Sequence, residues 1–458
     1  MPKQLLVSRR KAQMALFVKY MDDFITQVEK VSLFNENFGK MLFMVCLSQM
    51  VDKYFAPSIK MGNNVLRYRL SVLLISPSRS GKGQATKVAK EFLTAADVQW
   101  VKTTQFTDAG MIGTIDKDIA KLASMMVAKG AASAETLDLD PIIPGDLKNY
   151  RVIFFDEAKS LVVPGKWTQN IYEILQEALD DPGIVRKKLS DKYPITYETH
   201  VSIVATTYYL KNFHQTLMEQ GFFQRILVLV EQISPEQRKK LNDAICLDWT
   251  DDTDDSHIKN LAADMLDRIH AANKECKEKG IDFIQTTPEA RKAVKNLIGS
   301  HLQHMRTHFS GSDLEVLMPF TTGCIEKIWK MGAMSAILDN RYAVSAIDIA
   351  NVKEIIGLYL NSIMNEILAN VEQKTTQREK YEARIMQILK TVGEGGVPKT
   401  ELYRVIQDRL GLDYNRVVNI VRRMIDNGSL LVRKEKPSGK GRPKEYISPN
   451  VNQGELKA

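Results

Sequence analysis

An α/β fold with a parallel sheet, followed by a helical block and a smaller C-terminal domain, is the architecture that this sequence of 458 residues predicts. Two short apolar runs, 70–75 and 152–155, have the composition of strands that are buried on both faces. The first run leads through a loop into a helix-compatible stretch, which is the unit from which parallel sheets are built. The length is enough for two or three domains, each with its own core.

Composition excludes several classes of protein. No apolar run reaches the roughly 18 residues that a membrane span needs, and Met1-Pro2-Lys3 does not begin a signal peptide, so neither feature is expected. The four cysteines lie far apart, which argues against a zinc knuckle or a disulfide framework and favours a reducing, intracellular setting.

Residues 1–60 are expected to form helices that pack beside the sheet. The segments 15–31 and 38–55 carry apolar residues at helical spacing. The sequence ahead of the first strand shows no separate module of the size that a nucleic-acid-binding barrel would need.

The first strand leads into SPSRSGKG, residues 76–83, and then into a helix. This is the order of a phosphate-binding loop, in which backbone N–H groups and a helix N-terminus face the anion and the lysine reaches the outer phosphates. The pattern G-x-x-x-x-G-K-[ST] has Ser76 at its first glycine and Gly83 in place of the metal-binding hydroxyl, so a chance turn between strand and helix is the alternative. The residues expected to bind nucleotide are Ser78, Ser80, Gly81, Lys82, Gly83 and Gln84.

The second apolar strand, 152–155, ends in Asp156 and Glu157. In a parallel sheet ligands bind beyond the carboxyl ends of the strands, so both carboxylates would emerge beside the phosphate loop. We expect Asp156 to hold Mg²⁺, directly or through water, and Glu157 to polarise the attacking water. The alternative is an acidic helix cap after a buried strand.

Three segments around the acidic pair connect these motifs. Glycines and threonines interrupt helical periodicity over 103–119, where we expect a loop or an insertion within a helix. Residues 129–148 are rich in small residues, prolines and acids and are predicted to form a solvent-exposed connection. Residues 170–181 are predicted to form an amphipathic helix that ends before Pro182-Gly183.

A β-hairpin is predicted over 184–200, and its second arm runs into a buried strand at 201–205. Thr206 and Thr207 end that strand, at the place of a sensor of the terminal phosphate. Basic residues on a hairpin are usually a solvated edge-strand device, but in a ring-shaped motor they would track a nucleic-acid backbone. The basic residues of the hairpin are Arg186, Lys187, Lys188 and Lys192.

Arg225 stands directly before another apolar strand, in GFFQRILVLV. It is either a surface residue or, at a subunit boundary, a group that neutralises charge on the ATP of a neighbouring subunit. Helical segments are predicted over 257–280 and 286–309. The run 325–363 is predicted to form two helices that would suit a lid over a nucleotide site, although a helical spacer would carry the same pattern.

The C-terminal segment 376–450 is predicted to be a winged helix-turn-helix domain, because three helices precede a β-ribbon with a Gly/Pro/Lys-rich tip. Residues 378–444 contain 16 Lys/Arg and 8 Asp/Glu, a balance of +8 that equals the net charge of the whole chain. The charge excess therefore lies in the one unit shaped to enter a DNA groove. The alternative is a winged helix used only for protein contacts. The residues expected to contact DNA are Tyr414, Asn415, Arg416, Asn419, Arg422, Arg423, Lys434, Lys440 and Arg442.

Residues 70–365 resemble the AAA+ motor of minichromosome maintenance-type helicases, and the C-terminal segment resembles the winged helix of archaeal members. The likeness lies in SPSRSGKG, FFDEAKSL, IYEILQEAL, HVSIVATT, GFFQRILVLV and FTTGCIEKIWKMGAMSAIL. By this resemblance Lys82 would contact phosphate, and Asp156 and Glu157 would be the metal and catalytic carboxylates.

The resemblance further implies that Thr207 stands at the sensor position, which is usually an asparagine, and that Arg225 is a finger reaching into the next subunit. Where the family's lid helix carries a second arginine sensor, this chain has Gly323, with Lys327 and Lys330 as the nearby cations. The N-terminal domain of cellular members is absent from this sequence, so the chain resembles a compact relative from a virus, plasmid or other mobile element.

The sequence therefore predicts an intracellular, cytoplasmic, ATP- and Mg²⁺-dependent DNA helicase that forms a homo-oligomeric ring, expected to be a hexamer. Single-stranded DNA would occupy the channel and duplex would meet the winged helix. The predicted segments are an N-terminal helical segment (1–60), the ATPase core (61–235), a linker and lid (236–375) and the winged helix (376–450). Two rivals are an origin-binding initiator ATPase that does not unwind and a degenerate ATPase that acts as a DNA-bound scaffold.

Overall fold

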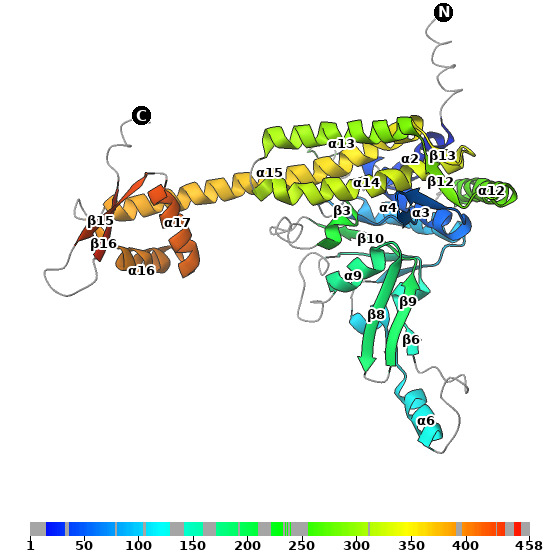
Figure 1. Cartoon of the computed structure of the whole chain (residues 1–458), viewed down its shortest axis with the longest axis horizontal. Coiled ribbons are helices and arrows are strands. Elements are labelled where there is room, and N and C mark those ends of the chain that lie inside the picture. The colour runs from blue at the N-terminus through cyan, green and yellow to red at the C-terminus, as the bar shows by residue number, and fades with distance from the viewer. Residues whose placement is uncertain are drawn as a thin grey trace, which may run out of the picture. The chain divides into compact units, whose positions relative to one another are not determined.

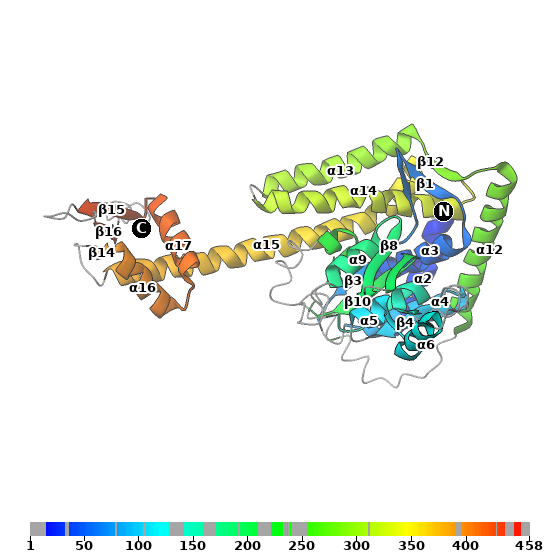
Figure 2. The same ribbon diagram turned by 60° about the horizontal axis from the view of Figure 1, so that its bottom comes forward.

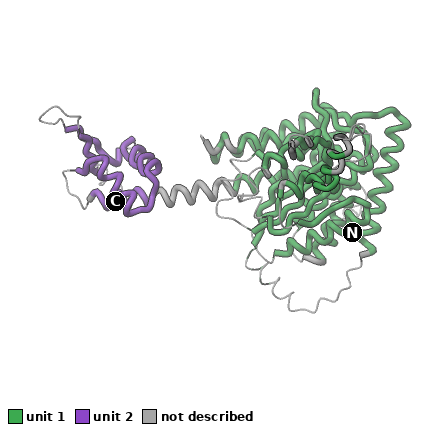
Figure 3. The backbone as a smooth tube through the Cα atoms, turned by 90° about the horizontal axis from the view of Figure 1, so that it is seen from below, with its two compact units in different colours: residues 1–366 green, residues 367–458 purple. Residues whose placement is uncertain are grey.

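The structure is a computed structural model in which the chain divides into two compact units, residues 1–366 and 367–458 (Figure 3). The boundary falls within one long helix, α15 (Ala346–Lys390). The residues that the structure describes are 15–32, 36–77, 80–103, 107–128, 142–158, 171–190, 193–208, 221–231, 255–309, 312–390, 396–426, 428–435 and 444–449, with the single positions 234, 236 and 239.

A five-stranded parallel sheet forms the centre of the first unit and confirms the predicted α/β class. Its strands, in spatial order, are β11 (Leu227–Val230), β3 (Val72–Ile75), β10 (Ser202–Thr207), β7 (Val152–Phe155) and β4 (Trp100–Thr103). Every residue of β3, β7 and β10 is buried, as their apolar runs predicted. The edge strand β4 was not predicted, because it is short and only half-buried.

The N-terminal helices α2 (Leu16–Ser32) and α3 (Glu36–Tyr54) are confirmed, and they pack beside the sheet as expected. Helix α3 contacts strands β3, β10 and β11 as well as helix α4 (Lys82–Ala95). Residues 38–51 of α3 are all buried, which suits a helix that is apolar around its whole circumference. These helices are therefore part of the core of the first unit.

A second, small sheet was not predicted. Its order is β13 (Ala343–Val344), β12 (Phe283–Thr286), β1 (Ser58–Met61) and β2 (Asn64–Leu66). Strands of two to four residues leave little periodic signal in a sequence, and the pairing of β1 with β12 joins residues more than 200 positions apart. This sheet joins the N-terminal region to the helical block.

The helical block was predicted and consists of α12 (Asp255–Lys279), α13 (Pro288–His308), α14 (Ser312–Leu338) and the first part of α15. Helix α12 packs on α2, α3 and α4, and α14 packs on α2 and α3. Figures 1 and 2 both show these helices gathered with α2, α3 and α4 on one side of the first unit.

The predicted hairpin is formed by β8 (Gly183–Ser190) and β9 (Tyr193–Thr199), after helix α9 (Ile171–Leu179). Figure 1 shows it extending away from the central sheet, on the side opposite the helical block. A pair of short helices, α5 (Asp108–Ile112) and α7 (Asp146–Asn149), packs near its base, and the Tyr197 hydroxyl of β9 donates to the Ile112 carbonyl at 3.0 Å.

Those short helices belong to an insertion between β4 and β7 that also contains β5 (Gly113–Ile115), α6 (Lys117–Ala128) and β6 (Ile142–Pro144). A loop or an insertion within a helix was expected over 103–119, whereas the segment lies between two strands and contains α5 and β5; the antiparallel pairing of β5 with β6 was not predicted. The expectation of a solvent-exposed connection over 129–148 is wrong for its last part, because β6 and α7 are ordered there and Leu147 is buried. Residues 129–141 lie outside the described part of the chain.

The second unit contains the end of α15, α16 (Lys399–Leu410), α17 (Tyr414–Asp426) and a three-stranded antiparallel sheet. The sheet order is β14 (Val397–Pro398), β16 (Lys444–Pro449) and β15 (Leu430–Glu435). Its core is apolar and draws on all three helices and all three strands. The predicted three helices and β-ribbon are therefore present, and only the two-residue β14 was missed.

Candidate functional site

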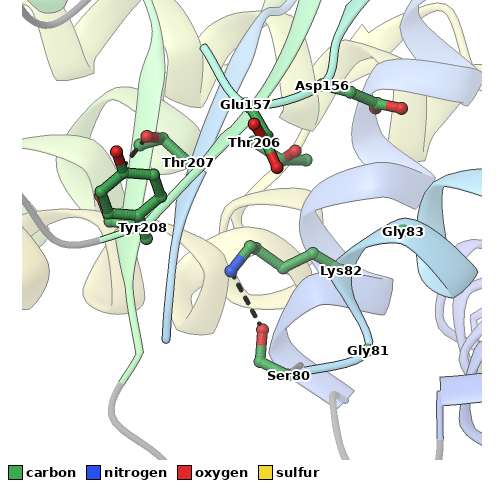
Figure 4. A pocket seen from close by; sticks show the side chains of 9 residues that line it. All are labelled: Ser80, Gly81, Lys82, Gly83, Asp156, Glu157, Thr206, Thr207 and Tyr208. Atoms are coloured by element: carbon green, nitrogen blue, oxygen red, sulfur yellow. Dashed lines mark hydrogen bonds between the residues drawn. The ribbon is translucent and has the colours of Figure 1, made fainter. Parts of the chain in front are cut away.

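The candidate site is a cavity of about 290 Å³ at the carboxyl ends of three central strands, β3, β10 and β7. Strand β10 lies between the other two, so the two threonines at its end separate the loop that follows β3 from the acidic pair that follows β7. Figure 4 shows the residues that line the cavity, which are Ser80, Gly81, Lys82, Gly83, Asp156, Glu157, Thr206, Thr207 and Tyr208.

The loop after β3 delivers a helix N-terminus to this cavity. Gly81 has φ 80°, a left-handed conformation that glycine adopts without strain, and α4 begins at the next residue. Among the described residues, no side chain caps the first turn of α4. Its N–H groups and the positive end of its dipole therefore face the cavity without a side-chain acceptor, which is the arrangement that binds anions.

Lys82 has no carboxylate partner among the described residues. Its ammonium donates to the Pro77 carbonyl at 2.8 Å, to the Ser80 hydroxyl at 3.2 Å and to the Ser76 carbonyl. Burial lowers the pKa of Lys82 to about 8, because the charged form is desolvated without a counter-charge. An anion in the cavity would supply that counter-charge.

The two acidic residues have different surroundings. Asp156 forms an ion pair with Lys102 on the edge strand β4, at 2.5 Å between Oδ2 and Nζ, and this contact raises the pKa of Lys102. Glu157 is exposed and has φ 55°, and the following residue is fixed by a bond from its N–H to the Thr206 carbonyl at 2.8 Å. In Figure 4 the two carboxylates point in different directions, and Glu157 lies beside Thr206.

Thr206 and Thr207 point to opposite faces of β10, because side chains alternate along a strand. The Thr207 hydroxyl, which the resemblance places at the sensor position, donates to the Tyr208 carbonyl at 3.3 Å. Thr206 is the one beside Glu157 in Figure 4. Sequence reasoning placed both threonines at the position of a phosphate sensor and singled out Thr207 by resemblance. It missed Tyr208, whose signal was its place directly after the predicted strand.

Arg225 does not line the cavity of its own chain. It follows the short helix η2 (Gly221–Gln224) and binds both carboxylate oxygens of Asp180, at 2.5 Å from Nε and 3.2 Å from Nη2. A further bond joins its Nη1 to the Gly221 carbonyl at 3.1 Å.

Lys327 and Lys330 do not lie in the cavity either. Lys327 is buried and donates to the Gln224 carbonyl, and burial lowers its pKa to about 8. Lys330 forms a buried ion pair with Asp181 at 2.6 Å. No described residue of the helical block lines the cavity: α12 packs on α2, α3 and α4, α14 packs on α2 and α3, and α13 packs on α14.

Among the remaining candidates for nucleotide contact, Ser78 lies outside the described residues, and Gln84 is exposed in the first turn of α4 without lining the cavity. Asp156 and Glu157 offer the oxygen ligands that Mg²⁺ takes when it arrives with nucleotide phosphates. The part of the chain that the structure describes contains no cluster of three or more His, Cys, Asp or Glu that could hold a metal by itself.

The structure describes only some of the hairpin residues that were predicted to contact DNA. Arg186 is exposed on β8, and Lys187 and Lys188 continue that strand, with their side chains outside the description. Lys192 lies in the undescribed turn.

The predicted contacts of helix α17 all lie on its exposed face, and its opposite face places Val417, Val421 and Met424 in the core. The exposed residues are Tyr414, Asn415, Arg416, Asn419, Arg422 and Arg423. Lys434 is exposed on β15 and lies 3.4 Å from Glu445. Lys440 and Arg442 lie outside the described residues.

Comparison with known proteins adds no relative: no protein-family model matches the chain, and a search of curated proteins finds no match. Within the described residues, no helix combines the length and apolar character needed to cross a membrane. The three cysteines that the structure describes, Cys46, Cys276 and Cys324, are buried and free.

Proposed function

We propose that this protein is an ATP-driven DNA helicase with an AAA+ core and a C-terminal winged helix, working as a hexameric ring. The observation that carries the proposal is the convergence at one cavity of Lys82, which has no described carboxylate partner, the uncapped start of α4 and the Asp156–Glu157 pair. The three strands whose carboxyl ends border the cavity, β3, β10 and β7, are neighbours in the parallel sheet, which supports a ligand site at this edge.

The proposed chemistry is hydrolysis of the terminal phosphoanhydride. The loop N–H groups and the Lys82 ammonium would hold the outer phosphates. Glu157, exposed at the cavity and free of any described ion pair, would orient and polarise the attacking water. Mg²⁺ bound with the nucleotide, with Asp156 as its protein ligand, would neutralise developing charge.

Two surfaces support DNA as the partner. The exposed face of α17 presents three arginines and two asparagines, side chains that contact phosphates and base edges, on a helix anchored by its apolar face. The hairpin β8–β9 extends from the ATPase unit with Arg186 exposed on β8. We propose that the hairpin grips single-stranded DNA in the ring and that the winged helix engages duplex, during replication of a virus, plasmid or other mobile element inside a host cell.

The proposal predicts ATP hydrolysis that drives strand displacement. Lys82→Ala should abolish nucleotide binding, whereas Glu157→Gln should retain binding and lower the rate of hydrolysis by about 10²-fold or more, because it removes only the general base. Lys87 is an exposed residue elsewhere on α4, so Lys87→Ala is the matched control. It should leave nucleotide binding and the rate of hydrolysis unchanged.

Assays on a forked duplex separate the rivals. Strand displacement that requires ATP supports the helicase. Duplex binding with ATP turnover but no displacement at any protein concentration supports the initiator. If neither Lys82→Ala nor Glu157→Gln changes the rate of ATP turnover, the result supports a degenerate ATPase that acts as a DNA-bound scaffold.

A further inference from the structure

The Lys102–Asp156 ion pair stands at the carboxylate that would serve the metal. Lys102 lies on β4, in parallel register with β7, so that its side chain reaches the first residue after β7. The Lys102 side chain is 52% exposed and that of Asp156 is 27% exposed. The pair is therefore accessible to solvent and can open.

The loop offers no second protein ligand at the usual place. Gly83 follows Lys82 and carries no hydroxyl, so Asp156 is the carboxylate on which a nucleotide-bound Mg²⁺ would depend most. The Lys102 ammonium and Mg²⁺ would then both need the carboxylate of Asp156. When Mg²⁺ binds Asp156, the Lys102 ammonium has to leave it; when Mg²⁺ is absent, Lys102 neutralises the charge that would otherwise repel the phosphates.

We propose that Lys102 competes with Mg²⁺ for Asp156 and thereby sets the metal requirement of the nucleotide site. The inference rests on the proposed function, because it needs nucleotide in this cavity. An exposed ion pair changes an equilibrium by up to about fivefold, and that is the size of effect expected here.

The test is the equilibrium binding of a fluorescent ATP analogue, measured first in EDTA and then at increasing Mg²⁺ concentration. This measurement does not depend on hydrolysis. Lys102→Met should weaken binding in EDTA by about fivefold, because Asp156 then faces the phosphates unpaired, and should lower the half-saturating Mg²⁺ concentration by about fivefold. If Lys102→Met only disturbed the structure of the site, binding of the analogue would weaken both in EDTA and with Mg²⁺.

Two variants act as controls for charge. Lys102→Arg keeps a cation beside Asp156 and should retain the wild-type dependence on Mg²⁺. Lys87→Met removes a similarly exposed lysine from an ion pair with Glu91 on α4 and should change neither measurement.

Gly83→Ser tests the same idea from the other side. A Cβ at Gly83 meets no atom within 4 Å, and the residue is not in the left-handed region, so the hydroxyl can be installed without strain. It should lower the half-saturating Mg²⁺ concentration and leave binding in EDTA unchanged.

The competition is overturned if Lys102→Met leaves the half-saturating Mg²⁺ concentration unchanged or raises it, or if it weakens binding equally in both conditions. Failure of the proposed function has a different signature: the wild type would bind no analogue, or Lys82→Ala would bind it as the wild type does. In that case both the proposed nucleotide site and the competition at Asp156 are rejected.

Discussion

At the scale of single residues, Lys82 is half-buried, and among the described residues its ammonium bonds only uncharged oxygens. Such a group is poised to take up an anion, since a phosphate would replace weak acceptors by a full counter-charge. Its lowered pKa makes this property measurable, because the lysine is only about half protonated near pH 8 in the free protein.

Nucleotide affinity should therefore fall as the pH rises above about 8, because phosphate binding requires the charged lysine and takes up a proton. Folding stability from this group has the opposite sign: the unfolded lysine binds more protons between about 8 and 10.5, so stability rises with pH in that window. Calorimetry at pH 8 in two buffers of different ionisation enthalpy would show proton uptake on binding. Lys82→Arg, which stays charged, should remove the uptake; unchanged uptake in that variant would assign the proton to another group.

At the scale of elements, the turn between α9 and β8 joins the hairpin to the rest of the first unit. Arg69, just ahead of β3, donates to the Ala178 and Asp180 carbonyls before the hairpin and to the Thr199 carbonyl at its end. Asp181 lies buried between Arg69 at 2.9 Å and Lys330 at 2.6 Å. The base of the hairpin is thereby fixed next to β3, the strand that leads into the loop carrying Lys82.

Asp181→Asn should destabilise the first unit by about 3–5 kcal/mol, because it leaves two buried cations without their carboxylate. Asp180→Asn, which removes a half-exposed partner of Arg225, should cost less than about 1 kcal/mol. All four tryptophans lie in residues 1–366, so the fluorescence midpoint in urea reports this unit alone. Equal shifts of the urea midpoint in the two variants would contradict the argument that the buried Asp181 contributes more to stability than the half-exposed Asp180.

The sequence was informative wherever a local pattern decides the structure. Fully buried strands such as β3 and β7, the hairpin, and helices with one apolar face were predicted because composition and spacing carry their signal. The edge strand β4 was missed because its residues are partly buried or exposed, and with it the contact of Lys102 with Asp156 was missed. That contact joins residues 54 positions apart, and no local pattern encodes it. The positions of Lys327 and Lys330, away from the cavity, likewise depend on tertiary packing.

At the scale of the whole molecule, the position of Arg225 bears on how subunits cooperate. Asp180 holds the arginine, which does not line the cavity of its own chain, so any role in hydrolysis has to be exercised on a neighbour. In a ring with head-to-tail interfaces, each site would combine Glu157 of one subunit with Arg225 of the next.

Mixing two inactive variants tests this arrangement. Arg225→Ala and Glu157→Gln proteins, each deficient alone, should regain about a quarter of wild-type ATPase when equal amounts are combined at random, because about one interface in four then pairs an intact Glu157 with an intact Arg225. Lys82→Ala mixed with Glu157→Gln should regain nothing, since both changes lie in the same cavity and mixing repairs neither. If the Arg225→Ala mixture also stays inactive while the subunits exchange, Arg225 does not act in trans, and its bond to Asp180 is its structural role.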